Sequence, residues 1–201
     1  MNESTGNREI ILEHALALFS ERGYEAVSVQ ELVNAAGVTK PTLYYYFGSK
    51  TGVYEAILER HYARLDSALA AAARYEPHPA DYFADMYPVL LGLTLCYFDF
   101  ARADEAFYRM ALASLFLPPS SQVQAMTRKY HFRQYGISEA MFASMSAAHG
   151  NLRGKERRLS WTYIGLVNAF IGLYFGAGDS PALNGETAGE LVRQFMHGIH
   201  A

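Results

Sequence analysis

The sequence has little cysteine and no excess of positive charge. Cys96 is the single cysteine among 201 residues. It cannot form an internal disulfide, so we expect a reducing compartment, the cytoplasm. Seventeen Lys and Arg residues stand against twenty Asp and Glu residues, a formal charge of −3. This balance excludes a basic coat for nucleic acid and a polybasic membrane tail, so any binding to nucleic acid must be local.

Catalytic and metal-binding motifs are also missing. The sequence contains no His-Glu-x-x-His, no Gly-x-Ser-x-Gly and no Walker motif. Only His197 and His200 stand three residues apart, with no carboxylate or cysteine beside them, so we expect no metal and no cofactor. These absences disfavour an enzyme. A helical enzyme or a membrane-attached protein that carries the N-terminal motif described below is the alternative interpretation.

Membrane segments are not favoured by the sequence. The first eight residues lack the apolar run of a secretion signal. Residues 159–178 are uncharged and long enough to cross a bilayer, but they include four glycines and several hydroxyl and amide side chains. Lipid-facing helices favour continuous Leu, Ile, Val and Phe, and the mean hydropathy of the chain is −0.04. We therefore predict a buried helix at a subunit interface, and no membrane partner.

The apolar pattern is helical throughout. No segment alternates polar and apolar residues between hairpin turns, and apolar residues recur at steps of three and four. This predicts an all-α fold of about nine helices, at residues 8–23, 29–36, 40–47, 50–75, 79–101, 104–117, 120–148, 155–177 and 186–200. Ser28 and Glu31 form a capping-box pattern, and Thr39 caps the third helix. We expect a bend at Pro88 and a weak point at Gly136.

The first three helices fit a helix-turn-helix, in which the third helix enters the major groove of DNA. The helical period predicts an inward face of Leu43, Tyr46 and Phe47. The side chains that would meet DNA are Lys40, Pro41, Thr42, Tyr44 and Tyr45. Lysine suits guanine or phosphate, proline and threonine suit thymine methyl groups, and tyrosine hydroxyls suit phosphate oxygens. The alternative role for the tyrosines is core packing.

Four motifs in the first fifty residues carry a family resemblance. They are Phe19-x-x-x-Gly23-Tyr24, Val27-Ser28-Val29-x-x-Leu32, Ala35-Ala36-Gly37-Val38 and Leu43-Tyr44-Tyr45-Tyr46-Phe47-x-Ser49-Lys50. With them the chain resembles the TetR family of bacterial transcriptional regulators. The resemblance implies a homodimer with a helix-turn-helix DNA-binding domain, at residues 1–60. A helical effector-binding and dimerisation domain would follow at residues 61–201.

The resemblance also implies roles for single residues. Ser28 and Lys50 would touch phosphates, and the recognition segment would consist of Thr39, Lys40, Pro41, Thr42, Tyr44 and Tyr45. Tyr46 departs from the family, because many members carry histidine there. Four basic residues stand against six acidic ones in residues 1–50, a net charge of −2. Binding to phosphates would then depend on helix N-termini and hydroxyl donors, with a shallow salt dependence.

Aromatic residues are concentrated in residues 75–117, which hold ten of them. Such density suits an effector cavity, which the resemblance places in this domain, although each ring could equally fill the core. The residues predicted to line the cavity are Tyr82, Phe83, Tyr87, Tyr97, Phe98, Phe107, Phe116, Trp161 and Asn168. Asp99 could face a cationic effector, but a solvated position is favoured.

The last two predicted helices have the pattern of a dimer interface. Apolar side chains recur at helical steps, and glycines permit close approach. The predicted interface residues are Leu166, Phe170, Leu173, Tyr174, Leu191, Phe195 and Ile199. Two such helices from each subunit would form a four-helix bundle. The sequence thus predicts a ligand-responsive repressor, released from a pseudo-palindromic operator when a small apolar or aromatic effector binds.

Overall fold

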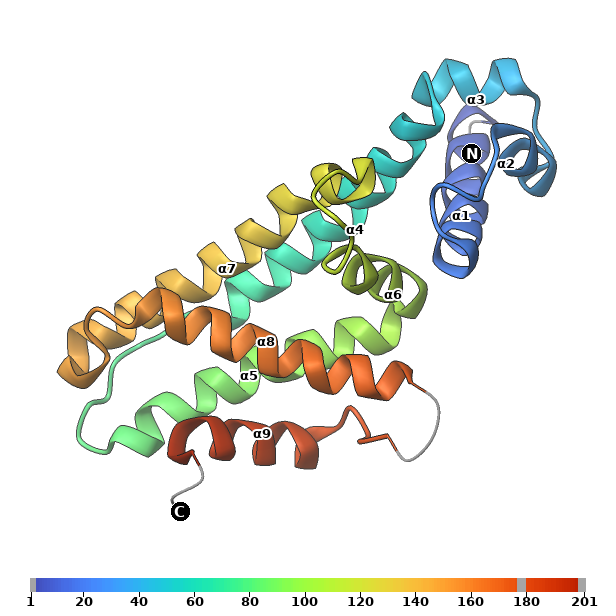
Figure 1. The fold of residues 1–201 in the computed structure, drawn as a ribbon. Helices are drawn as coiled ribbons and strands as arrows, with labels where there is room; N and C mark the ends of the chain where they lie inside the picture. Colours follow the sequence, from blue (N-terminus) through green and yellow to red (C-terminus); the bar gives the residue numbers. More distant parts are fainter. Residues whose placement is uncertain (1–2, 177–179, 199–201) are drawn as a thin grey trace. The chain divides into compact units, whose positions relative to one another are not determined.

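The computed structural model describes residues 3–176 and 180–198, and these residues form nine α-helices and one short 3-10 helix (Figure 1). The helices are α1 (Glu3–Arg22), α2 (Val29–Ala36), α3 (Lys40–Phe47), α4 (Lys50–Ala72), α5 (Tyr82–Ala103), α6 (Glu105–Ser114), α7 (Gln122–Ala148), η1 (Gly150–Leu152), α8 (Glu156–Phe175) and α9 (Gly185–His197). The predicted all-α fold is confirmed.

Capping groups in the sequence explain where the short helices begin. Ser28 accepts a hydrogen bond from the Glu31 amide at 3.2 Å, and Glu31 accepts one from the Ser28 amide at 2.8 Å, which completes the predicted capping box of α2. Thr39 accepts from the Thr42 amide at 3.3 Å and caps α3. Helix α5 continues through Pro88, and α7 continues through Gly136.

Contacts within the chain group it into two compact units. Unit 1 consists of Met1–Ala63 and Glu105–Arg128, and unit 2 consists of Arg64–Asp104 and Lys129–Ala201. Helix α6 and the first turns of α7 therefore belong with the N-terminal helices. The predicted division of the chain at residue 60 stays a prediction.

In unit 1, α1 packs against α2, α3 and α6, and α2 packs against α3. The apolar face of α1 is buried through Ile11, Leu12, Ala15 and Phe19. The ring of Phe19 lies 5.4 Å from that of Tyr54 on α4, in an edge-on arrangement. This contact makes α4 part of the core beneath the N-terminal helices.

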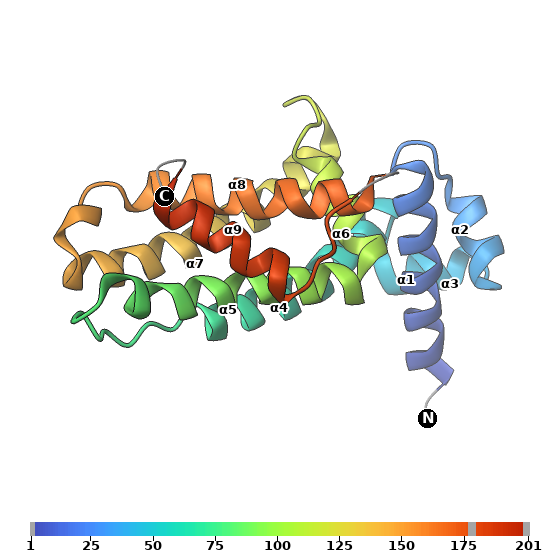
Figure 2. The ribbon, with the colours of Figure 1, turned by 90° about the horizontal axis from the view of Figure 1, so that it is seen from below.

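In unit 2, α9 packs on α5 and α8, and α5 packs on α8 (Figure 2). Tyr163 of α8 is fully buried, and its hydroxyl bonds Thr94 at 2.7 Å and donates to the carbonyl of Leu90 at 2.5 Å. Among the described helices, α5 is long and apolar enough to cross a membrane, a test that core helices of soluble proteins also meet. The stretch at 159–178, tested from the sequence, is not such a candidate in its described part.

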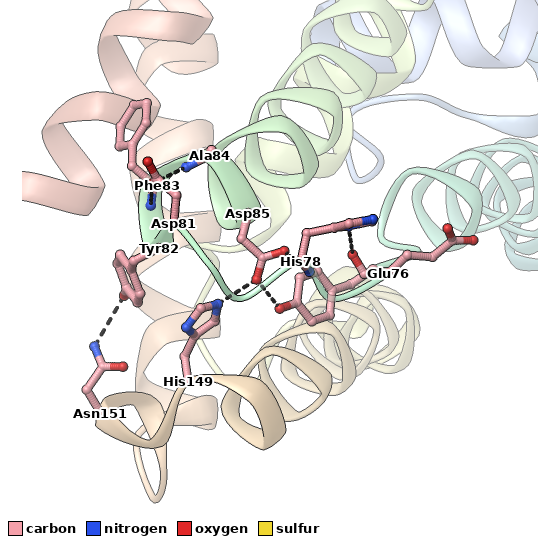
Figure 3. Close-up of polar contacts among 10 residues, drawn as sticks. Glu76, His78, Asp81, Tyr82, Phe83, Ala84, Asp85, His149 and Asn151 are labelled. Carbon is pink, nitrogen blue, oxygen red and sulfur yellow. Dashed lines mark hydrogen bonds and ion pairs between the residues drawn. The ribbon is translucent and has the colours of Figure 1, made fainter.

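A buried carboxylate joins three segments of unit 2 (Figure 3). Asp85, in the first turn of α5, is 6% exposed. It accepts hydrogen bonds from the Tyr75 hydroxyl at 2.5 Å and the His78 amide at 2.6 Å, and it lies 2.5 Å from Nε2 of His149. The ring of Tyr82 packs edge-on against His149. The loop before α5, the start of α5 and the end of α7 are held together by this one side chain.

The environment of Asp85 determines its charge. Burial alone would raise the pKa of this carboxyl group, because a buried charge is poorly solvated. The hydrogen bonds from Tyr75, His78 and His149 outweigh burial and hold the pKa below its usual value. The carboxylate is therefore ionised in the folded protein, and its low pKa depends on these three hydrogen-bond donors.

We predict that Asp85→Asn lowers the free energy of unfolding by about 2–3 kcal/mol, because an amide cannot accept from all of these donors. Urea unfolding monitored by circular dichroism measures the change. The control is Asp99→Asn, since Asp99 is exposed and its ion pair with Arg102 lies on the surface. We expect a change of no more than about 0.5 kcal/mol for the control.

The difference in stability between wild type and Asp85→Asn is predicted to depend on pH. A carboxyl group whose pKa is lowered by folding contributes stability that is present above its unfolded pKa, about 3.9, and is lost as the pH falls further. The stability difference between wild type and Asp85→Asn should therefore shrink as the pH falls below about 3.9. A difference that stays constant down to pH 2.5, or one that grows, would contradict an ionised, stabilising Asp85.

Candidate nucleic-acid interface

A tight turn sets the direction of α3 relative to α2. Gly37 ends α2 with φ 64°, a left-handed conformation that glycine adopts without strain. The Val38 amide then donates to the carbonyl of Val33 at 3.0 Å, and Thr39 begins α3. Leu43, which is fully buried, anchors α3 on the core of unit 1. This is the predicted helix-turn-helix geometry.

The outer face of α3 is open to solvent. Tyr45 is 81% exposed and Tyr44 is 47% exposed. Thr39, Lys40 and Pro41 are exposed as well. The predicted outward face is therefore confirmed in its placement, while contact with DNA by these residues stays a prediction.

The inner and flanking side chains of α3 are only partly buried. Tyr46 and Phe47, predicted to face inward, are half-buried. The guanidinium carbon of Arg8 lies 5.5 Å from the centre of the Phe47 ring. Thr42 is also half-buried, and its hydroxyl bonds that of Thr39 at 2.8 Å. The Thr42 side chain thus makes a hydrogen bond with the residue that caps α3.

Ser28 is exposed, but its hydroxyl is already engaged. It donates to a carboxylate oxygen of Glu31 at 2.7 Å, and Arg22 donates to the other oxygen of Glu31 at 2.7 Å. The hydrogen bonds from the backbone and side chain of Ser28, followed by that from Arg22, lower the pKa of Glu31 to about 2. A carboxylate therefore lies beside the serine that was predicted to touch a phosphate, and the phosphate contact stays a prediction.

Lys50, which was predicted to touch a phosphate, begins α4 and makes contacts within the protein. Its side chain is half-buried, and Nζ donates to the carbonyls of Tyr24 at 3.0 Å and Val27 at 2.9 Å. The same ammonium group lies 4.2 Å from the centre of the Tyr24 ring. Two of its three donors are thus used to hold the loop between α1 and α2. In this structure Lys50 holds that loop, and its contact with a phosphate stays a prediction.

The nine residues predicted to line an effector cavity differ widely in exposure. In unit 2, Tyr97 and Phe98 are fully buried. Phe83, Tyr87 and Asn168 are half-buried, and the ring centres of Phe83 and Tyr87 lie 4.8 Å apart in a stacked arrangement. Tyr82 is 39% exposed and Trp161 is 52% exposed. Five of these, at 82, 83, 87, 97 and 98, lie along α5. Their contact with an effector stays a prediction.

Phe107 and Phe116 both belong to unit 1, and their contact with an effector stays a prediction. Phe107 is fully buried, with its ring stacked on His61 at 4.6 Å and edge-on to Tyr62 at 5.0 Å. Phe116 is 84% exposed just after α6. One ring is a core residue and the other lies on the surface, because α6 packs against α1 rather than within unit 2.

The predicted dimer residues lie on α8 and α9. Leu173 is 59% exposed, and the half-buried residues are Leu166, Phe170, Tyr174 and Phe195. Leu191 is fully buried within its own subunit, and its contact with a partner stays a prediction. Ile199 lies outside the described residues. A groove of about 690 Å³ runs between the two helices and is lined by Lys155, Arg158, Leu159, Thr162, Leu166, Gln194 and Phe195.

Comparison with known proteins agrees with this geometry. The family model for "Bacterial regulatory proteins, tetR family" matches residues 11–57, which contain α2, the turn and α3. The transcriptional activator FasR of Mycolicibacterium smegmatis is 28% identical over 193 residues, which cover 94% of this chain and 80% of FasR. The transcriptional repressor ComR of Escherichia coli is 39% identical over 83 residues, 39% of this chain and 40% of ComR.

Solved structures share the whole fold. The regulator FadR of Bacillus subtilis, in complex with stearoyl-CoA, superposes with a TM-score of 0.78 at 13% identity, and the match covers 96% of this chain and 99% of FadR. Residues 11–57 therefore belong to the tetR family of bacterial regulatory proteins, and the whole chain shares the fold of a solved TetR-family transcriptional regulator.

Proposed function

We propose that this protein is a cytoplasmic homodimeric repressor. Each subunit would insert α3 into one of two successive major grooves of a pseudo-palindromic operator, about 34–36 Å apart. An apolar effector bound in the C-terminal part of the chain would release the DNA by shifting α4. The observation that carries the proposal is the open outer face of α3, where Tyr45 is 81% exposed.

The charges of the N-terminal helices support recognition through this face rather than through a general attraction to phosphate. Arg22 is paired with Glu31 at 2.7 Å, and Arg8 with Glu9 at 3.3 Å. Lys40, at the start of α3, makes no ion pair with a described residue. Because few cations are available, affinity should fall only gently as the salt concentration rises.

Selection of bound duplexes from a random DNA pool should enrich an inverted repeat. On that operator we expect Tyr45→Ala to weaken binding by about tenfold, because it removes a large side chain from the face that would meet the groove. Fluorescence anisotropy at fixed salt measures the change. The control Phe116→Ala removes another strongly exposed ring, outside α3, and should bind like wild type.

An unchanged affinity for Tyr45→Ala would contradict the role of α3. Failure of the selection to enrich any repeat, with folded wild-type dimer, would contradict sequence-specific binding itself.

Dimerisation is supported by the surface of α8. Leu173 and Trp161 are 59% and 52% exposed there, and Gly165 lies on the same helix with open space around it. Exposed apolar side chains beside a small residue suit a closely packed second copy of the helix. The groove beside Leu166 and Phe195 extends this surface towards α9.

We predict that Leu173→Glu converts the dimer to a monomer and weakens operator binding by at least about tenfold, because a charge would be buried without a partner at the interface. Sedimentation equilibrium measures the change in mass. The control Phe116→Glu places the same charge on an exposed apolar position away from α8 and should remain dimeric. A dimeric Leu173→Glu protein would place the interface elsewhere.

The effector is proposed to be an apolar acyl compound. FadR of Bacillus subtilis holds stearoyl-CoA in a fold that matches this chain, and α5 of this chain carries a row of aromatic side chains that suits an apolar ligand. We expect stearoyl-CoA to lower affinity for the selected operator by at least about tenfold, within the usual range of allosteric coupling. Coenzyme A alone should have no effect.

Two outcomes would contradict this part of the proposal. One is an affinity for the operator that stays the same when stearoyl-CoA, stearate or isovaleryl-CoA is added. The other is reduced transcription from the operator's promoter when the gene is deleted, since loss of a repressor raises transcription. The second outcome would make the protein an activator, as FasR is named.

A further inference from the structure

Helix α8 carries a row of exposed residues with a symmetric order of sizes. The row lies along one side of the helix at steps of four residues and consists of Trp161, Gly165, Ala169 and Leu173. The outer two are large, with Trp161 52% exposed and Leu173 59% exposed, and the inner two are small. A Cβ added at Gly165 would meet nothing within 4 Å. The order large, small, small, large is the same from either end of the row.

Such a row is complementary to itself when two copies of the helix run in opposite directions. In a two-fold symmetric dimer the same surface faces itself, so every contact occurs twice. If two α8 helices cross midway between Gly165 and Ala169, the small residues meet at the crossing and allow close approach. Trp161 then lies at the level of Leu173 of the partner subunit, because both are six residues from the crossing point.

The groove between α8 and α9 lies at the level that the partner's Leu173 would reach. On α8 it is lined from Lys155 to Leu166, and on α9 by Gln194 and Phe195 (Figure 2). Its apolar wall consists of Leu159, Leu166 and Phe195, which are half-buried. An exposed leucine on one copy and an apolar groove on the other would remove each other's surface from water.

The charges in this groove favour one direction of the second helix. Lys155 and Arg158 line the groove, are exposed, and make no ion pair with a described residue. In the opposite-direction arrangement Arg158 lies at the level of Gly176 of the partner subunit, the residue that follows α8. The last carbonyl groups of a helix carry partial negative charge, which attracts cations. A copy running in the same direction would instead bring these cations against the same cations of its partner.

We propose that the two α8 helices of the dimer cross in opposite directions at Gly165 and Ala169, and that Leu173 of each subunit fills the groove between α8 and α9 of the other. This inference rests on the homodimer proposed above and adds its direction, its register and the occupant of the groove. Because Lys155 and Arg158 face the end of the partner's α8, the dimer should weaken as the salt concentration rises.

The test exchanges charge between two positions that only a second copy can bring together. Within one α8, residues 158 and 173 are about 22 Å apart along the helix. Leu173→Lys should raise the Kd of the dimer at least about hundredfold, because each lysine enters a groove that already holds two cations. Arg158→Glu alone should raise it about fivefold, through loss of the attraction to the helix end. The double variant Leu173→Lys/Arg158→Glu should return to within about tenfold of wild type, because lysine then meets a carboxylate. Sedimentation equilibrium measures each constant.

The matched control is Leu173→Lys/Arg74→Glu, which carries the same change of charge. Arg74 is exposed, follows α4 and lies outside α8, so this protein should dissociate as readily as Leu173→Lys. Trp161 is the single tryptophan of the chain, and its fluorescence gives a second measurement. Acrylamide should quench it at least about twofold less in wild type and in the double variant than in Leu173→Lys, because the partner's Leu173 covers it.

Two results would overturn this arrangement and leave the proposed dimer intact. One is a dimeric wild type whose double variant dissociates as readily as Leu173→Lys, and the other is an equally strong rescue by Arg74→Glu. A monomeric wild type would contradict the dimer itself, and this inference with it.

Discussion

The turn between α2 and α3 is the constraint on which the DNA-binding surface depends. Gly37 takes a left-handed conformation with φ 64°, which a side chain would strain, and Thr39 caps the next helix at once. The direction of α3 is thereby fixed by backbone geometry, and Leu43 needs only to fill the core beneath it. With its inner side anchored, α3 must present Tyr45 outward. The outward direction of Tyr45 is thus a consequence of the turn and of the buried Leu43.

The charges near this surface are largely used within the protein. Arg22 neutralises Glu31, and Lys50 holds the carbonyls of Tyr24 and Val27. These cations stabilise the loop and caps that position α3. Specificity would then rest on the fit of α3 in the groove, with Lys40 and the N-terminus of α3 as the local sources of positive potential.

Much of the fold could be predicted because it follows from local rules. Caps such as Ser28 and Thr39 act within three residues, and the helical period identifies Leu43 as buried and Tyr45 as exposed. Tertiary contacts have no such signal. Asp85 and His149 are 64 residues apart, and neither lies in a recognisable motif. Leu191 and Phe107 have the pattern of an interface and of a cavity wall, but the packing of α9 and α6 makes them core residues.

Buried hydroxyl groups in unit 2 limit the kind of ligand that this part of the chain can recognise. In unit 2, Tyr163 is satisfied by Thr94 and Leu90, and Ser160 lies 2.5 Å from Ser138. Hydroxyls that already have partners would gain little from a polar ligand, so recognition around α5 would depend on apolar contact, as an acyl chain provides.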